Sequence, residues 1–330
     1  MLYPQVRMRR LRLNPTVRNL VAETRLDASE FVLPIFFDAN IKKPKTTDSM
    51  PNVTTYPLSG YKKIVEKIQG SGVDSVLVFG IPSKKDAKGS DAYDDDGVVQ
   101  KAIRGLRKES DSLLIIADLC MCEYTDHGHC GILDKDGYVI NDETIEVYGK
   151  IAVSQAKAGA NIIAPSGMMD GQIMAIRAAL DDAGFENTAI MAYSAKFYSA
   201  YYGPFRDVAC SAPGKGNRAS YQMPCGNRRE AMREIDMDVA EGADMIMVKP
   251  AGPYLDIIRE AANAYDLPLA AYQVSGEYAM IKAAGQNGWI DEDRVMMESL
   301  LAIKRAGANI IITYFAMDAA KLLREQNGRS

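Results

Sequence analysis

The sequence LLIIADLCMCEYTDHGHC, residues 113–130, joins an apolar run to a dense cluster of reactive side chains. The run LLIIA is short and continuous, as is typical of a buried strand. Asp118, Cys120 and Cys122 follow at alternate positions, so they point to one side if the chain stays extended that far. The stretch therefore predicts a strand that ends in carboxylate and thiol groups.

Three of the five cysteines and both histidines lie in this stretch, and Cys130 closes it. Thiolates grouped in this way suit a soft or borderline metal ion, and zinc is the first choice. Three ligands without a fourth would leave a position open for catalysis, whereas His127 or His129 as fourth ligand would close a structural site. The cluster alone does not separate these hypotheses. A disulfide is disfavoured because nothing marks the chain as secreted.

The composition is that of an ordinary globular protein, with 330 residues, 47% hydrophobic and 25% charged. The net charge of −4 argues against nucleic acid or a membrane surface as a general partner. The basic N-terminal sequence lacks the apolar core of roughly 7–15 residues of a signal peptide, and no run of about 18 apolar residues predicts a membrane span. The odd, low number of cysteines fits a reducing compartment, so we expect the chain in the cytoplasm.

Outward from residues 113–119, similar apolar or β-branched runs recur along the chain, and segments of helical periodicity separate them. The runs are 31–37, 75–79, 113–119, 161–165, 189–195, 245–248, 267–274 and 309–315. The helical segments are 58–69, 98–108, 144–158, 172–183, 228–241, 254–264, 277–284 and 292–305, and residues 317–325 can supply a helix after the last run. This alternation predicts an α/β fold of the (β/α)8 TIM-barrel type.

Two regions account for the residues beyond the ~250 that such a barrel needs. Residues 1–30 are rich in arginine and carry no clear apolar period, so they form either an arm that packs on a partner subunit or a partly disordered tail. Residues 31–330 would form the catalytic barrel. The stretch of about 197–227, after the fifth strand, is rich in Gly, Ser, Tyr and Pro, and a loop of this length is usually a lid or a binding loop.

The carboxyl ends of the strands build the active site in such a barrel. Lys196 follows the fifth run, with the parity of Ser194, and Lys249 follows the sixth. A lysine there can simply mark the solvent end of a strand, because burial of an unpaired ammonium is unfavourable. Two lysines on neighbouring strands favour another interpretation. The positive charge of each lysine disfavours protonation of the other, and partial burial disfavours protonation of both. Neutral amines of this kind form Schiff bases with carbonyl substrates.

Further polar residues indicate a substrate with a carboxylate. Three cations lie in the predicted lid: Arg206, Lys215 and Arg218. Ser275 and Tyr314 offer neutral hydroxyl donors at the ends of other strands. Each residue alone could be an ordinary surface group, and only the grouping carries weight.

These residues together predict a zinc-dependent barrel enzyme that forms Schiff bases with a carboxylated ketone or aldehyde. A class I aldolase is the alternative enzyme, with one essential lysine and no need for zinc. A zinc-binding assembly protein without activity is the alternative from another class. It would need the cysteines but neither lysine.

The sequence resembles the porphobilinogen synthase family, also called 5-aminolevulinate dehydratase, over nearly its whole length. The matching stretches are DLCMCEYTDHGHCG (118–131), SGMMDGQI (166–173), YSAKFYSAYYGPFRDV (193–208), SYQMP (220–224), NRREAMRE (227–234), EGADMIMVKPAGPYLDIIRE (241–260), YQVSGEY (272–278) and ITYFA (312–316). The resemblance implies a lyase (hydro-lyase) that condenses two molecules of 5-aminolevulinate to porphobilinogen with loss of two waters, in tetrapyrrole and heme biosynthesis.

The resemblance also implies roles for single residues. Lys249 would hold the first substrate and Lys196 the second, both as Schiff bases, and Asp118 would handle protons beside the zinc and Lys196. The positions that match carboxylate-binding groups are Ser275 and Tyr314 for the first substrate and Arg206, Arg218 and Gln222 for the second, with Lys215 in a variable part of the lid.

Metal and subunit contacts follow from the same resemblance. Cys120, Cys122 and Cys130 match catalytic zinc ligands, which some family members replace with acidic residues that use magnesium. Glu234 matches a glutamate that organises a hydrated magnesium ion between subunits in some members, although an exposed helical glutamate would look the same. Family members assemble as octamers through N-terminal arms that wrap a neighbour, which suits the basic arm here. The resemblance therefore implies a homo-oligomer, with an octamer expected. Neither nucleic acid nor a membrane is implied as a partner.

Overall fold

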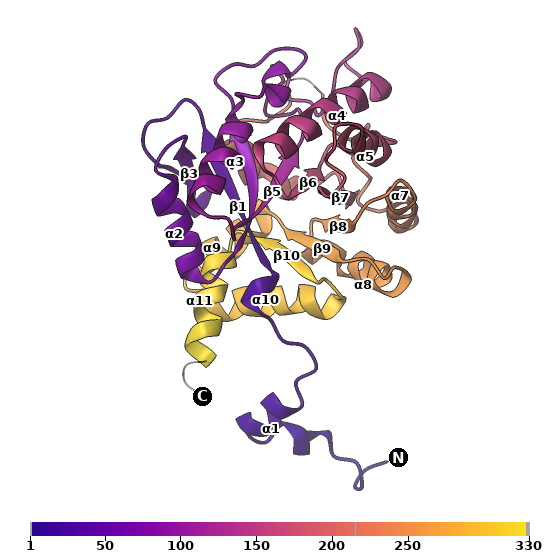
Figure 1. Ribbon diagram of the computed structural model, residues 1–330. Helices are drawn as coiled ribbons and strands as arrows, with labels where there is room; N and C mark the ends of the chain where they lie inside the picture. Colours follow the sequence, from indigo (N-terminus) through magenta and orange to yellow (C-terminus); the bar gives the residue numbers. More distant parts are fainter. Residues whose placement is uncertain (1, 215, 328–330) are drawn as a thin grey trace.

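Eight parallel strands close into a barrel in this computed structural model, which describes residues 2–214 and 216–327 (Figure 1). The barrel strands are β1 (Phe31–Asp38), β4 (Ser75–Ile81), β5 (Leu114–Leu119), β6 (Ile162–Pro165), β7 (Ala189–Lys196), β8 (Met245–Lys249), β9 (Leu269–Gln273) and β10 (Ile310–Thr313). Neighbours along the chain pair with each other, and β10 pairs with β1 to complete the ring. The predicted (β/α)8 barrel is confirmed.

Helices cover the outside of the barrel. They are α2 (Tyr61–Ser71), α3 (Val98–Glu109), α4 (Asn141–Ala158), α5 (Gln172–Asp182), α7 (Arg228–Ala240), α8 (Leu255–Ala264), α9 (Ser275–Gln286), α10 (Glu292–Ala306) and α11 (Ala316–Asn327). Strands enclosed by helices outside and side chains inside are buried on both faces, which explains their continuous apolar runs. None of the helices in residues 2–214 and 216–327 combines the length and apolar character needed to cross a membrane.

The sequence did not predict one hairpin, which consists of β2 (Lys45–Thr47) and β3 (Met50–Pro57). β3 runs parallel to the carboxyl end of β1 but lies outside the ring. Its sequence MPNVTTYP is polar and carries a proline at each end, so it gives no apolar run. The helix after it begins at Tyr61 rather than at residue 58, because Gly60 adopts a left-handed turn conformation there.

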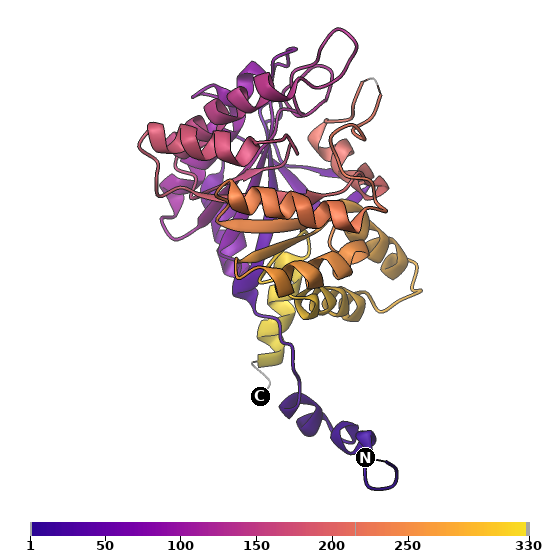
Figure 2. The ribbon, with the colours of Figure 1, turned by 90° about the vertical axis from the view of Figure 1, so that its right-hand side faces the viewer.

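The N-terminal segment projects away from the barrel (Figures 1 and 2). It contains the short helices η1 (Met8–Arg12) and α1 (Pro15–Leu20), neither of which buries a residue. Leu2 and Leu20 are 79% and 80% exposed. The arm therefore presents apolar side chains that find no partner within the described part of its own chain.

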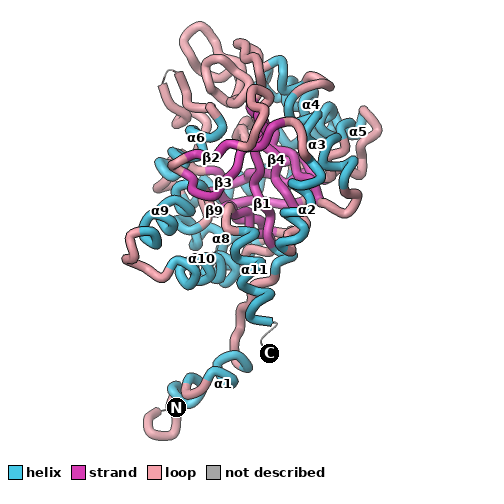
Figure 3. The backbone as a smooth tube through the Cα atoms, turned by 90° about the vertical axis from the view of Figure 1, so that its left-hand side faces the viewer, coloured by secondary structure: helices cyan, strands magenta, loops and turns pink. Residues whose placement is uncertain are grey.

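The long insertion after β7 folds at the end of the barrel opposite the arm (Figure 3). It contains η4 (Ala200–Tyr202) and the helix α6 (Gly203–Ala209). Phe205 of α6 packs on the rings of Phe36 and Phe79, at centroid distances of 5.7 and 5.2 Å. The α6 part of the insertion thus packs on side chains of the barrel strands.

Candidate active site

The two candidate lysines lie side by side at the carboxyl ends of β7 and β8. Lys196 is in register with Lys249, and the residues are 5% and 6% exposed. Lys249 Nζ lies 4.1 Å from the ring centre of Tyr272, and Lys196 Nζ donates to the backbone carbonyl of Ser166. Burial, and then the charge of Lys196, lower the pKa of Lys249 to about 7 against the opposing charge of Asp118. Much of Lys249 is therefore a neutral, nucleophilic amine near pH 7.

An irregularity in β7 determines which of its side chains face the barrel interior. The register with β8 shifts after Ala192. Tyr193 and Lys196 consequently both lie inside, where the ring centre of Tyr193 is 4.9 Å from Lys249 Nζ and 5.6 Å from Lys196 Nζ. Ser194 instead hydrogen-bonds a carboxylate of α7 on the outer side of the strand. The shared parity of Ser194 and Lys196 is therefore wrong as a guide to their orientation, because a bulge interrupts the alternation.

Asp118, near the end of β5, faces the same space as the lysines. Its residue is buried, and Oδ2 accepts a hydrogen bond from Ser166 Oγ at 3.1 Å. Burial, and then repulsion from Glu123, raise the pKa of Asp118 to about 7, while the charges of Lys249 and Lys196 oppose this change. A carboxyl group in these surroundings can exchange a proton with a molecule held between the lysines.

The three cysteines of the central stretch converge at this end of the barrel. Their Sγ atoms lie within 4.8 Å of one another, and all three residues are buried. β5 ends at Leu119, so the extended run does not reach Cys120 and Cys122; a turn brings their Sγ atoms to 3.4 Å from each other. Three thiols at this spacing fit one zinc ion, whose bonds to sulfur are ~2.3 Å long.

Neither histidine joins this group of potential ligands in the part of the chain that the structure describes. His129 Nδ1 lies 3.1 Å from the hydroxyl of Tyr221, which also accepts a hydrogen bond from the backbone N–H of Cys130. His127 Nε2 lies 3.3 Å from the backbone carbonyl of Ala87. The arrangement of three thiols favours an open metal site over a closed one.

Sequence reasoning missed a buried carboxylate beside the cysteines. Glu123 is 3% exposed, and Cys122 Sγ donates to its Oε2 at 3.2 Å. Burial raises the pKa of Glu123. Sequence reasoning assigned no role to Tyr193, at the end of the fifth strand, and missed Tyr272; the rings of both lie near Lys249. A glutamate in a loop and a tyrosine in an apolar strand give no local signal, because their surroundings come from other segments.

The predicted lid contributes several buried polar groups. Arg218 is 4% exposed, and its Nη2 donates to the backbone carbonyls of Gly128 and Ser211 at 3.0 and 2.6 Å. Nε of Arg206, Nε of Arg218 and both amide atoms of Gln222 are buried without a hydrogen-bond partner among the described residues. Each unsatisfied buried group costs about 1–3 kcal/mol, so these atoms point to a polar ligand between lid and barrel.

Ser275 and Tyr314 lie on the Lys249 side of the barrel mouth. Ser275 begins α9; its hydroxyl accepts a hydrogen bond from the backbone N–H of Phe205 at 3.0 Å and donates to a backbone carbonyl of η4. The hydroxyl of Tyr314 is 3.1 Å from that of Tyr272, whose ring contacts Lys249. The Phe205 ring is 5.6 Å from Lys249 Nζ, so Ser275 and Lys249 flank one lid residue.

Two predicted positions remain, Lys215 and Glu234. Lys215 lies outside the described residues. Glu234 lies on α7, where it lines a cavity of about 470 Å³ together with Asp170 and Glu230. Burial, followed by repulsion from these two carboxylates, raises the pKa of Glu234.

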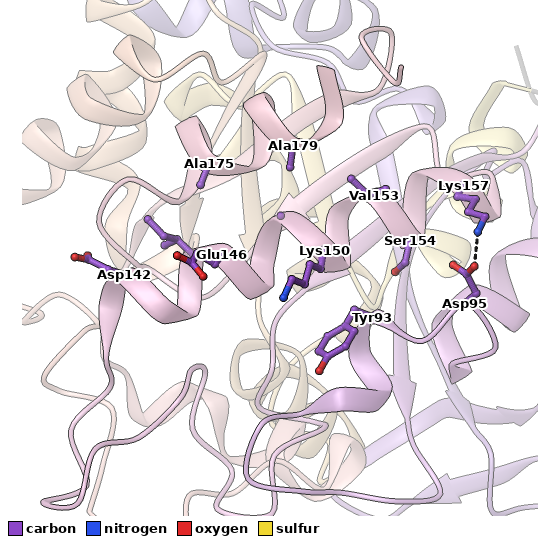
Figure 4. A pocket seen from close by; sticks show the side chains of 12 residues that line it. Tyr93, Asp95, Asp142, Glu146, Lys150, Val153, Ser154, Lys157, Ala175 and Ala179 are labelled. Atoms are coloured by element: carbon purple, nitrogen blue, oxygen red, sulfur yellow. Dashed lines mark hydrogen bonds and ion pairs between the residues drawn. The ribbon is translucent and has the colours of Figure 1, made fainter. Parts of the chain in front are cut away.

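A larger cavity of about 710 Å³ lies on the outer surface between α4, α5 and the turn η3 (Ser90–Tyr93) (Figure 4). Tyr93, Glu146 and Lys150 line it, and Lys157 pairs with Asp95 at one end. Its lining includes none of the predicted site residues. The predicted site residues gather instead at the barrel mouth, where the lysines and cysteines meet.

Sequence comparison identifies relatives over almost the entire chain. Residues 5–322 match the family described as Delta-aminolevulinic acid dehydratase. The enzyme of that name from Archaeoglobus fulgidus is 55% identical over 98% of this chain and 99% of its own length. The enzyme of that name from Escherichia coli is 52% identical over 96% of this chain and 98% of its own length.

Structural comparison agrees. The delta-aminolevulinic acid dehydratase (porphobilinogen synthase) of Toxoplasma gondii, solved with its reaction product porphobilinogen, superposes with a TM-score of 0.96 at 38% sequence identity. The match covers 100% of this chain and 95% of the other. The family expected from the sequence motifs is confirmed: this chain belongs to the delta-aminolevulinic acid dehydratase family.

Proposed function

We propose that this enzyme condenses two molecules of 5-aminolevulinate to porphobilinogen, with loss of two waters, through Schiff bases at Lys249 and Lys196. The observation that carries the proposal is the pair of buried lysines in register on β7 and β8. Membership of the family supports it, as does the porphobilinogen bound in the Toxoplasma gondii relative. A single lysine would suffice for an aldolase, so the pair favours a reaction with two carbonyl groups.

The first substrate would bind on the β8–β10 side. The neutral amine of Lys249 attacks the ketone carbon, and loss of the ketone oxygen as water leaves the imine. Ser275 and Tyr314 would hold the carboxylate through their hydroxyl groups. The rings of Tyr272 and Tyr193 exclude water from the amine and keep the pKa of Lys249 low through burial.

The second substrate would bind under the lid, at Lys196. Its carboxylate supplies a partner for the buried atoms of Arg206, Arg218 and Gln222 that have none among the described residues. Lys215 would add a further cation from the same lid. Two anion-binding sites of different chemistry, hydroxyls on one side and guanidinium groups on the other, would keep the two identical substrates in distinct roles.

The reaction balances in atoms and protons. One carbon–carbon bond joins the two substrates, and one carbon–nitrogen bond forms between the amine of the first and the carbonyl carbon of the second. The two ketone oxygens leave as water, and both lysine amines are released when the ring forms. Asp118 would accept and return protons, because its carboxyl lies in the same buried space as both lysines.

Cys120, Cys122 and Cys130 would hold zinc, since their three thiols lie at the right spacing and are shielded from solvent. When bound there, zinc supplies a Lewis acid that polarises an oxygen of the substrate. Free thiols persist in a reducing compartment, which supports a cytoplasmic location. Glu234, with Asp170 and Glu230 beside it, would bind magnesium at a subunit contact, and the exposed arm would assemble the chains into an octamer.

Pyrrole formation from 5-aminolevulinate, measured before and after treatment with a chelator, tests the proposal. Product that appears, stops on chelation and returns with added zinc supports both the reaction and the metal. Product formation that continues after chelation would restrict zinc to a structural role. Absence of pyrrole from folded, zinc-loaded protein would contradict the assignment.

The substitution Lys249→Met should lower turnover by at least about 10³-fold, because it removes the nucleophile of the first imine. The fold should persist, since methionine fills a similar buried volume. Circular dichroism checks the fold, and borohydride reduction followed by mass spectrometry checks the imine. Lys101→Met, at an exposed position of α3, is the matched control and should keep full activity. Substantial turnover by Lys249→Met would contradict the role of this lysine.

A further inference from the structure

A buried glutamate joins the loop that follows Lys249 to the start of α9, which carries Ser275. Glu277 lies in the first turn of α9 and is 7% exposed. Its Oε2 accepts a hydrogen bond from the backbone N–H of Val274 at 2.7 Å. Its Oε1 accepts one from the backbone N–H of Gly252, also at 2.7 Å. One carboxylate therefore ties the β8 loop to the β9–α9 loop.

The second of these hydrogen bonds exceeds what a helix needs. A glutamate at the third helical position commonly caps the N-terminus by bonding the N–H of the residue before the helix, as Glu277 does with Val274. The bond to Gly252 crosses to another βα loop. A capping role alone gives no reason for this contact.

The absence of a side chain at Gly252 leaves room for the carboxylate of Glu277. A Cβ atom built at Gly252 would lie 2.6 Å from Glu277 Oε1, which is shorter than an ordinary van der Waals contact. A side chain at position 252 would require this carboxylate oxygen to shift from its present place beside the N–H. Burial raises the pKa of Glu277 to about 7, while the hydrogen bonds from the backbone favour its charged form.

We propose that Glu277 is a positioning residue that sets the spacing between Lys249 and Ser275, and thereby allows one substrate molecule to engage both. The inference rests on the proposed function, in which Lys249 binds the ketone and Ser275 the carboxylate of the first substrate. Lys249 is three residues before Gly252, and Ser275 directly follows Val274. The carboxylate of Glu277 thus fixes the two anchors relative to each other without touching the substrate.

Binding of two ketones of equal length can distinguish a positioning role of Glu277 from a general structural role. 4-Oxopentanoate has a ketone and a carboxylate and engages both anchors, whereas 2-pentanone has a methyl group in place of the carboxylate and engages Lys249 alone. Reduction with borohydride traps either imine, and mass spectrometry of the Lys249 peptide reports the concentration needed for half-maximal trapping. In Glu277→Gln, one of the two backbone N–H groups faces an amide NH₂ and loses its acceptor.

Glu277→Gln should raise the half-maximal concentration about tenfold for 4-oxopentanoate and by less than about twofold for 2-pentanone. Gly252→Ala should produce the same selective loss, because the methyl group displaces the Glu277 carboxylate from the N–H of residue 252 and leaves its charge intact. Asp291→Asn makes the same carboxylate-to-amide change at a side chain that accepts a backbone N–H at the start of α10, and it should alter neither value.

Equal losses for both ketones, or no loss for either, would overturn the positioning role. Trapping of neither ketone at Lys249 of the unsubstituted enzyme would instead contradict the proposed function itself. The two failures are therefore distinguishable in the same experiment.

Discussion

The charge on Lys249 depends on the groups that surround its amine. Burial contributes most to the lowering of its pKa to about 7, and the ammonium of Lys196 contributes next. Removal of the charge at position 196 therefore raises the pKa of Lys249. The amine then needs a higher pH to become neutral and reactive.

We predict that imine trapping at Lys249 accelerates with pH, about tenfold per unit below pH ~7, and levels off above it. In Lys196→Met the rising limb should move to higher pH, since the repulsion between the two cations is lost. Mass spectrometry of the borohydride-reduced Lys249 peptide gives the rate and does not require turnover. Lys101→Met should leave the profile unchanged. Identical profiles for Lys196→Met and the unsubstituted enzyme would show that the two lysines do not interact.

The loop that carries the cysteines and the lid contact each other through backbone atoms as well as side chains. Arg218 of the lid donates to the carbonyl of Gly128, and the N–H of Gly214 donates to the carbonyl of His127. A Cβ built at Gly128 would lie 2.4 Å from the carbonyl oxygen of Ala212 in the lid. The two segments therefore fit together only if position 128 has no side chain.

Gly128→Ala should displace the lid, whereas Gly137→Ala should not. Both glycines have positive φ, of +72° and +89°, and alanine costs about 1–2 kcal/mol of stability at either position. A Cβ at Gly137 meets nothing within 4 Å, so this variant isolates the backbone cost. We expect Gly128→Ala to raise the KM for 5-aminolevulinate about tenfold and to speed proteolysis of the lid. Equal behaviour of the two variants would rule out a steric contact with the lid.

The arm and the barrel differ in how far their residues are buried in the single chain. The barrel buries most residues of its strands, whereas η1 and α1 bury no residue. Apolar side chains that are exposed in the single chain indicate a surface that another molecule covers. A second copy of the chain is the partner that the proposed assembly supplies.

Deletion of residues 2–24 should abolish the full assembly and leave the barrel folded, because the deleted part adds nothing to the core. Sedimentation velocity should show smaller particles, while circular dichroism retains the signal of an α/β protein. Met280→Ser, which alters an exposed apolar residue of α9, is the control and should assemble normally. An unchanged assembly after deletion would show that the arm does not hold the subunits together.

Local pattern determined much of this protein before any contact was known. The eight barrel strands follow from apolar runs because burial on both faces leaves few positions for polar residues. The cysteines, Lys196 and Lys249 could be singled out because their chemistry is unusual directly after such runs. The hairpin of β2 and β3 escaped prediction, since a strand outside the ring needs no continuous apolar run.

Tertiary structure decided the surroundings of these groups. The shift of register in β7 places both Tyr193 and Lys196 in the barrel interior, which strict alternation along the strand excludes. Burial of Glu123, the unpaired atoms of Gln222 and the bond from Gly252 to Glu277 arise between segments that are distant in the sequence or separated by turns. Periodicity reports one element at a time, whereas burial, pKa and hydrogen bonding depend on what other elements place nearby.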